Sequence, residues 1–117
     1  MKGWGGEVLE GIFGNGTAEK VLLYLLQYEE GYATAIADTF DDTSLSMVQG
    51  QLERFERAGV LVSTRKGRTR IFSWNPRYPF REELQALLTK ELDYLPEDER
   101  ERYFSQRRRP RRAGKPL

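Results

Sequence analysis

The sequence predicts a mainly α-helical fold that carries one small β-hairpin. Apolar residues recur at three- and four-residue spacing over residues 44–57, which is typical of an amphipathic helix about four turns long. A shorter helical pattern precedes it at residues 32–40. Two apolar runs follow, at residues 60–62 and 71–74, and a cationic segment with one glycine joins them. That arrangement predicts two strands and a tight turn.

The helix predicted over residues 44–57 has marked ends. Asp42, Thr43 and Ser44 can each accept a hydrogen bond from the free N–H groups of the first turn. Gly59 suits the left-handed position that follows the end of a helix. The apolar stripe expected to face the core consists of Leu45, Val48, Leu52 and Phe55.

The predicted hairpin has cations at its tip and aromatic residues at its base. Gly67 supplies the positive φ that a tight turn needs. On the return strand, Arg68, Arg70, Phe72 and Trp74 share one face, because strand side chains alternate. We expect the aromatic pair to pack against the helices and the arginines to project beyond the body. The fold class is therefore mainly α with a small β-hairpin wing, a winged helix-turn-helix with flanking N- and C-terminal helices.

The chain divides into four segments. Residues 1–16 are an N-terminal lead-in, and residues 17–95 form the winged helix-turn-helix domain with its C-terminal helix. Residues 96–104 form a short acidic helix. Residues 105–117 are a basic tail without apolar periodicity, which we expect to be disordered when alone.

Two further helices flank the motif. Thr17 is the expected N-cap of a helix over residues 18–29, and Gly31 is its expected end. That helix is apolar over much of its girth and therefore requires contacts on two sides. The helix of residues 80–95 is amphipathic, and its stripe is Phe80, Leu84, Leu87, Leu88, Glu91, Leu92 and Leu95.

Composition excludes several classes of function. The chain has no Cys and no His, which rules out disulfides, zinc fingers, thiolate chemistry and imidazole acid–base catalysis. Nothing is spaced as a carboxylate metal site, and residues 14–17 lack the Lys of a phosphate-binding loop. We therefore expect no enzyme, no cofactor and no metal. No apolar stretch approaches about 20 residues and residues 1–6 are not a signal peptide, so we expect a cytoplasmic protein without membrane contact.

The net charge of +1 conceals a strong asymmetry. Residues 1–60 carry four cations and ten acids, and residues 73–104 carry five cations and eight acids. Residues 61–72 carry four cations and residues 105–117 carry six, with no acid in either segment. Positive charge is thus concentrated in the wing and the tail, where phosphate contacts would use it.

The helix-turn-helix and hairpin resemble the winged helix-turn-helix regulators of the ArsR-like type. Residues 34–40 (TAIADTF) match the first helix of that motif, residues 44–49 (SLSMVQ) open the second, and residues 52–61 (LERFERAGVL) close it. Residues 65–70 resemble the wing. The absence of Cys and His departs from the metal sensors of this type.

Two shorter matches narrow the resemblance. Residues 12–14 (IFG) and 75–80 (NPRYPF) look like a bacterial and archaeal subgroup found near, or fused to, small nucleotidyltransferase domains. The resemblance extends from residue 12 to about residue 88. It implies a homodimer formed through the flanking helices, and such a dimer would match a two-fold DNA site.

We predict that the protein binds double-stranded DNA, with helix 44–57 in the major groove and the wing and tail on the backbone or minor groove. Ser46, Gln49 and Gln51 can bond base edges, Met47 can touch a thymine methyl, and Gly50 allows close approach. The predicted contact residues are Thr43, Ser44, Ser46, Met47, Gln49, Gly50, Gln51, Arg54, Arg65, Lys66, Arg68, Arg70, Arg107, Arg108, Arg109, Arg111 and Arg112.

Other interpretations remain open from the sequence. Asp41, Asp42 and Glu53 lie near the predicted DNA face and favour a winged helix used for protein contacts, such as an antitoxin-like partner of a nucleotidyltransferase. The wing can be an ordinary solvated hairpin, and the tail a solubilising segment with sequence-independent affinity for nucleic acid. The outer helices can complete a larger monomeric core instead of a dimer. RNA binding has less support, because Phe72 and Trp74 look buried.

Overall fold

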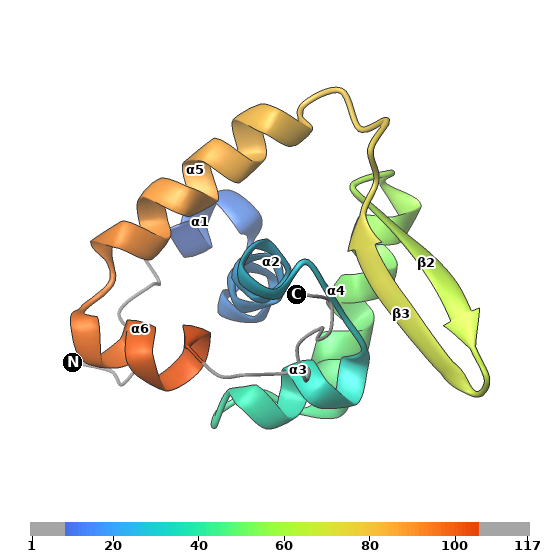
Figure 1. Cartoon of the computed structure of the whole chain (residues 1–117), viewed down its shortest axis with the longest axis horizontal. Coiled ribbons are helices and arrows are strands. Elements are labelled where there is room, and N and C mark those ends of the chain that lie inside the picture. The colour runs from blue at the N-terminus through green and yellow to red at the C-terminus, as the bar shows by residue number, and fades with distance from the viewer. Residues whose placement is uncertain (1–8, 106–117) are drawn as a thin grey trace, which may run out of the picture.

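A computed structural model describes residues 9–105 of the chain, and Figure 1 shows its arrangement. Six helices pack together, and a small antiparallel sheet with the strand order β1-β3-β2 lies at one side of them. The elements are α1 (Glu10–Phe13), α2 (Gly16–Tyr28), β1 (Glu30–Gly31), α3 (Ala33–Thr39), α4 (Leu45–Arg57), β2 (Leu61–Lys66), β3 (Thr69–Trp74), α5 (Arg81–Tyr94) and α6 (Glu97–Phe104). This is the predicted winged helix-turn-helix with flanking helices.

Helix α2 is the centre of the core. In Figure 1 the other elements surround it, and α2 contacts α1, α4, α5, α6 and β1. Nine consecutive residues of α2 are buried, from Thr17 to Leu25. The expectation that this helix has contacts on more than one side is confirmed, because a helix apolar all round can be satisfied only inside a core.

The start of α2 differs from the prediction. Asn15 is the N-cap, in an extended backbone conformation, and its Oδ1 accepts a hydrogen bond from the N–H of Ala18 (2.7 Å). The helix therefore begins at Gly16, and Thr17 is buried in its first turn. The prediction that Thr17 caps the helix is wrong, because the amide oxygen of Asn15 already meets the free N–H groups.

The end of α2 also differs. The helix ends at Tyr28, whereas Gly31 belongs to β1, a two-residue strand that the sequence did not predict. Gly31 pairs with Phe72, and a Cβ atom on it would lie 2.6 Å from a ring carbon of Tyr24. Glycine is therefore required at position 31 by close packing against a ring and not by helix termination.

Helix α4 begins and ends where the sequence predicts. Ser44 is its N-cap, and its Oγ accepts a hydrogen bond from the N–H of Met47 (3.2 Å). Gly59 has a φ of 84°, the left-handed conformation expected after the helix. Leu45, however, is 43% exposed and does not join the buried stripe, because it is the first helical residue and follows an exposed turn.

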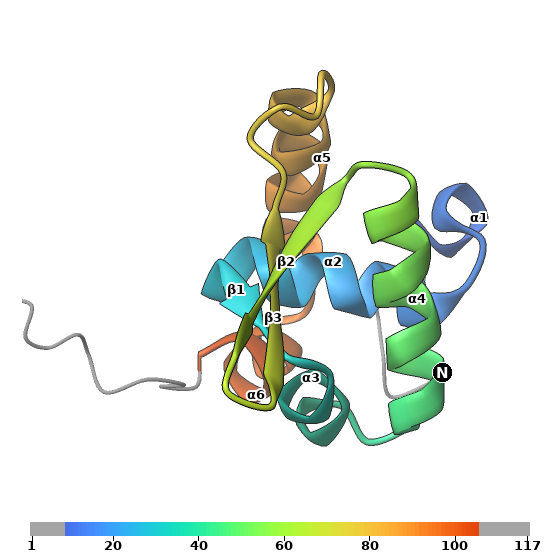
Figure 2. The same cartoon turned by 90° about the vertical axis from the view of Figure 1, so that its right-hand side faces the viewer.

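The hairpin has the predicted tight turn and aromatic base. Lys66 pairs with Thr69, and Gly67 has a φ of 64°. Phe72 is buried, and the indole N–H of Trp74 donates to the carbonyl of Leu25 (3.0 Å). Figures 1 and 2 show the hairpin projecting from the helical body on the side of α4.

The two C-terminal helices pack on α2 from the other side of the molecule. Leu88, Glu91 and Leu95 are the buried residues of the predicted stripe, whereas Phe80 and Leu87 are exposed. Only part of the predicted apolar stripe therefore reaches the core of the described residues. No helix within residues 9–105 is long and apolar enough to cross a membrane.

Candidate nucleic-acid interface

The exposed face of α4 carries no charged side chain near its N-terminus. Val48 and Leu52 face the core, and the opposite side of the same turns is open to solvent. The predicted contact residues on that open side are Ser44, Ser46, Met47, Gln49 and Gly50. Thr43 and Gln51 are half-buried, and each has a buried side-chain oxygen without a hydrogen-bond partner in the described part of the chain.

Gly50 has no packing role among the described residues. A Cβ atom at this position would meet none of their atoms within 4 Å. Glycine in the middle of a helix costs about 1 kcal/mol relative to alanine. The backbone of α4 is therefore left bare at a point where the protein itself gains nothing from the missing side chain.

Arg54 is separate from the other predicted contact residues. Its Nη2 donates to the carbonyl of Phe13 (2.9 Å), and its guanidinium carbon lies 4.9 Å from the ring centroid of Phe55. The side chain thus joins α4 to the end of α1. Its position on α4 suggested an exposed cation, but only the tertiary structure shows that α1 occupies that side.

The wing cations fall into two groups. Arg65, Lys66 and Arg68 are exposed around the tip. Arg70 instead forms an ion pair with Glu56 of α4, and its Nε donates to Oγ of Ser63 (3.1 Å). The expectation that Arg70 projects beyond the body is wrong, because it shares a strand face with Phe72 and that face turns toward α4.

Two residues that the sequence did not single out, Ser63 and Glu56, hold the wing against α4. Ser63 Oγ donates to Oε2 of Glu56 (2.6 Å) and accepts from Arg70, so the hydroxyl links the carboxylate to the guanidinium. The three residues come from α4, β2 and β3. No short-range spacing pairs them, so sequence reasoning had no signal for this contact.

A groove joins the helix to the wing. It has a volume of about 300 Å³ and lies between the start of α3, the exposed side of α4 and the strand β3. Gln49 and Glu53 line it from α4, Arg68 and Arg70 from the hairpin, and Tyr32 at the entrance to α3. Residues from the two predicted DNA-contact segments, 19 positions apart at Gln49 and Arg68, thus border one concave surface.

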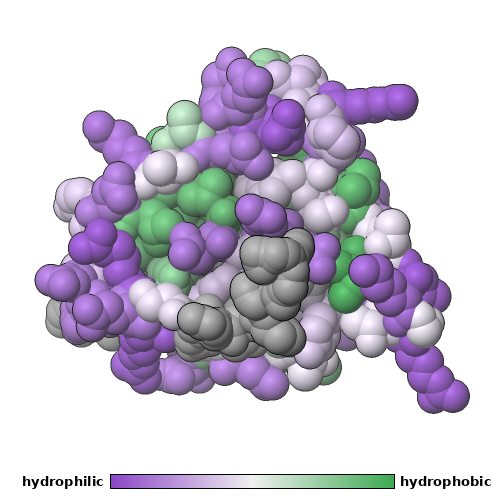
Figure 3. All heavy atoms as spheres, viewed as in Figure 1, coloured by the Kyte–Doolittle hydropathy of each residue, from purple (hydrophilic) through white to green (hydrophobic). Residues whose placement is uncertain are grey.

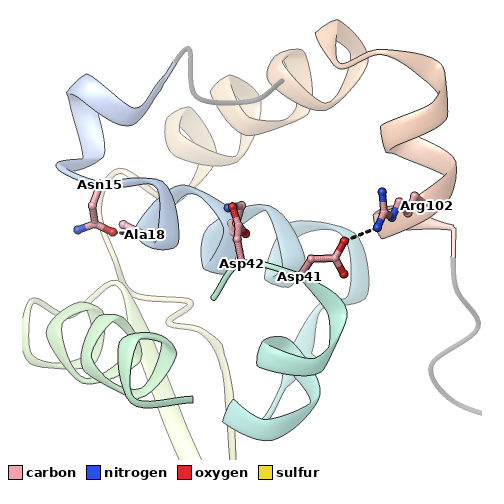
Figure 4. Close-up of polar contacts among 6 residues, drawn as sticks. Asn15, Ala18, Asp41, Asp42 and Arg102 are labelled. Atoms are coloured by element: carbon pink, nitrogen blue, oxygen red, sulfur yellow. Dashed lines mark hydrogen bonds and ion pairs between the residues drawn. The ribbon is translucent and has the colours of Figure 1, made fainter. Parts of the chain in front are cut away.

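The acids in the turn between α3 and α4 have cationic partners. Asp42 accepts from Nζ of the buried Lys20 (2.8 Å), and this hydrogen bond lowers the pKa of the Asp42 carboxyl. Asp41 forms an ion pair with Arg102 of α6 (Figure 4). The sequence suggested that these acids would repel phosphates, but part of their charge is neutralised from within the protein.

Helix α6 contacts the same turn through aromatic side chains. The ring of Phe40, which follows α3, lies 5.2 Å from the ring of Tyr103 and 5.9 Å from that of Phe104, measured between centroids. All three rings are buried. The helix that precedes the basic tail is therefore attached to the helix-turn-helix.

The remaining predicted contact residues belong to the tail. Arg107, Arg108, Arg109, Arg111 and Arg112 lie outside the described residues. Within residues 9–105 no group of three or more acidic side chains is gathered as a metal ion would require. No protein family, curated protein or solved structure matches the chain.

Proposed function

We propose that this protein binds double-stranded DNA in a sequence-specific manner, as a homodimeric transcriptional regulator. Helix α4 would enter the major groove, and the wing and basic tail would contact the backbone or minor groove. The observation that carries the proposal is the groove in which Gln49 of α4 and Arg68 of the wing lie together. A winged helix needs these two elements on one surface to contact bases and phosphates at once.

The side chains of α4 suit base readout more than phosphate attraction. Ser46 and Gln49 offer donors and acceptors that can match base edges, and Met47 offers an apolar group for a thymine methyl. Gly50 leaves room for the backbone to approach. Since these side chains are all uncharged, the affinity has to come largely from the wing and the tail.

In this proposal the wing contacts come from Arg65, Lys66 and Arg68, which are exposed, whereas Arg70 is paired with Glu56. The direct test is the affinity for a duplex from the region upstream of the protein's own gene and for a scrambled duplex, each across a salt series. Replacing the three cations with Ala should weaken binding to both duplexes. It should also reduce the salt slope by about 0.9 for each phosphate that the variant no longer neutralises.

Arg77 provides the matched control, because it is an exposed cation that follows β3 at the end away from the wing tip. Arg77→Ala should leave the salt slope unchanged. An unaltered slope in the wing variant would contradict the proposed role of the wing. Equal binding to both duplexes, abolished when the five tail arginines are changed to Gln, would show affinity without sequence readout.

A second candidate function is protein binding, as an antitoxin-like partner of a nucleotidyltransferase. It is favoured by exposed apolar side chains, that of Tyr32 in the lining of the groove and those of Leu45 and Met47 on α4. Co-expression with a nucleotidyltransferase encoded next to this gene tests it. A stable complex that Leu45→Asp and Met47→Asp disrupt would support this candidate, and separate elution of the two proteins would exclude it.

A further inference from the structure

A second groove lies between the C-terminal helices. It has a volume of about 340 Å³ and is bordered by the end of α2, the end of α5, and α6. Leu92 and Phe104 contribute apolar side chains to its lining. Figure 1 shows α5 and α6 on the side of α2 away from the hairpin. This C-terminal groove is therefore separate from the one between α4 and the wing, and none of the predicted DNA-contact residues lines it.

The rim of the C-terminal groove is acidic. Asp93 of α5 and Glu97 and Glu101 of α6 line it, and all three are exposed. No hydrogen bond or ion pair joins their carboxylates to another side chain within residues 9–105. Arg100 is the cation of the lining, and its Nε is buried without a hydrogen-bond partner in that part of the chain. The groove thus presents more negative charge than the described residues neutralise.

The chain leaves this groove with the opposite charge. Ser105, the last described residue, is itself part of the lining. The basic tail that begins there carries six cations and no acid, and five of the cations lie within residues 107–112. An extended chain spans about 3.5 Å per residue, so these cations lie within about 7 to 25 Å of the groove along the chain. A tether of this length gives an effective concentration of about millimolar.

We propose that the C-terminal groove holds the chain's own basic tail, through residues 107–112, in the free protein. Guanidinium groups bind carboxylates through paired hydrogen bonds, and the groove supplies three carboxylates that have no other partner among the described residues. Exposed ion pairs are individually weak and are screened by salt. Docking therefore depends on several contacts and on the tether, and it is reversible.

The docked tail affects the proposed function. Arginines held among carboxylates are withheld from phosphates until the denser negative charge of DNA competes for them. This consequence rests on the proposed function, whereas the docking itself does not. The test below uses no DNA, so failure of docking and failure of DNA binding are read by different experiments on the full chain.

The test is the rate at which trypsin cleaves the tail arginines of the full chain, followed by intact mass. A docked tail has to leave the groove before it can enter the active site of a protease, so the rate reports on docking. Combining Asp93→Asn, Glu97→Gln and Glu101→Gln should accelerate cleavage about five-fold. In about 1 M salt the wild type should be cleaved as fast as this variant, because the Debye length falls to about 3 Å. A synthetic peptide of residues 105–117 corrects for the effect of salt on trypsin.

A matched variant controls for net charge. Glu82→Gln, Glu83→Gln and Asp98→Asn together remove three exposed acids of the same two helices that do not line the groove. This variant should be cleaved at the wild-type rate, and circular dichroism confirms that both variants are folded. Equal rates for the wild type and the groove variant, or equal acceleration in the control, would overturn the proposal. Protection that increases with protein concentration would also overturn it, because the groove would then hold the tail of another copy.

Discussion

Two buried carboxyl groups face each other where α2 meets α5. Glu19 accepts a hydrogen bond from the N–H of Leu9 (3.3 Å), whereas neither carboxyl oxygen of Glu91 has a hydrogen-bond partner among residues 9–105. Burial raises the pKa of Glu91 to about 10, and the nearby carboxylate of Glu19 acts in the same direction. Burial also raises the pKa of Glu19. Glu91 is therefore protonated at neutral pH.

This pair makes stability depend on pH. The pKa of Glu91 is higher in the folded protein than the ordinary value of 4.5, so the unfolded chain loses its proton first as pH rises. Stability should be greatest below about pH 4.5 for this group and fall toward pH 10. Glu91→Gln keeps a donor without a titratable proton, and it should raise the free energy of unfolding at pH 8 by about 3 kcal/mol.

Denaturant unfolding at pH 5 and at pH 8 measures this effect. The gain from Glu91→Gln should be several-fold larger at pH 8. Glu82→Gln, on the exposed side of α5, should give the same small change at both values. An equal gain at both pH values for Glu91→Gln would show that Glu91 is not held protonated.

Substitution of Gly50 should change both stability and DNA binding. Gly50→Ala should raise the free energy of unfolding by about 1 kcal/mol, because the new methyl group meets no described atom within 4 Å and alanine favours the helix. The same methyl should weaken binding to the specific duplex about ten-fold by crowding the base edges.

Gly11→Ala in α1 is the matched control, since a Cβ atom there also meets nothing within 4 Å among residues 9–105. It should not change DNA affinity. If Gly50→Ala stabilised the protein and left binding unaltered, α4 would not approach DNA closely at this residue.

At the scale of elements, the orientation of the wing depends on a polar contact with α4. The hydroxyl of Ser63 connects Glu56 to Arg70, and Phe72 provides the apolar contact beneath them, 5.0 Å from the Arg70 guanidinium. Because the contact ties α4 to both strands of the hairpin, it sets where Arg65 to Arg68 lie relative to the exposed face of α4. The same contact therefore positions α4, which would contact bases, relative to the wing, which would contact phosphates.

Removing the Ser63 hydroxyl should loosen that arrangement. Ser63→Ala deletes two hydrogen bonds to charged groups, so the free energy of unfolding should fall by about 1–2 kcal/mol. Amide hydrogen exchange in β2 and β3 should accelerate. Ser73→Ala makes the same substitution in β3, where the hydroxyl has no hydrogen bond within residues 9–105, and should cost less than about 0.5 kcal/mol. Equal effects of the two substitutions would refute the anchoring role of Ser63.

At the scale of the whole molecule, α5 and the helix-turn-helix occupy different sides of α2 (Figure 1). A dimer through α5 would therefore leave α4 and the wing of both copies uncovered. Figure 3 shows the mixed surface from one side, with hydrophobic atoms gathered beside α5 and again on the side of the hairpin, and hydrophilic residues around them. Under the proposed function, two copies of α4 related by a two-fold axis would match a DNA site with two half-sites about one helical turn apart.

The link between dimerisation and DNA binding can be measured. The wild type should bind a duplex with two half-sites more tightly than a duplex with one. Leu87 is an exposed apolar residue of α5, so in a homodimer that pairs through this flanking helix Leu87→Asp should remove most of that difference while leaving affinity for the single half-site within about two-fold. Leu87→Met, which conserves volume and apolarity, should behave as the wild type. Loss of affinity for the single half-site in Leu87→Asp would mean that the substitution acts on the fold and not on the pairing.

The sequence by itself determined the helices, the hairpin and the order in which they follow one another. Ser44 and Gly59 bound α4, and Gly67 turns the hairpin, because caps and turns depend on neighbours within a few residues. The sequence alone also shows that positive charge is concentrated in the wing and the tail. The two-residue strand β1 could not be predicted in this way, because its hydrogen bonds go to β3, about 40 residues along the chain.

Only the tertiary structure decided which of these side chains are available to contact another molecule. Arg54 and Arg70 looked like free cations, yet their partners are Phe13 and Glu56 on other elements. Glu91 followed the apolar stripe, and its burial against Glu19 comes from the packing of α5 on α2. Spacing along a helix or strand fixes the direction of a side chain from its own backbone. What it meets there depends on segments distant in the chain, so charge and exposure at the site are properties of the assembled fold.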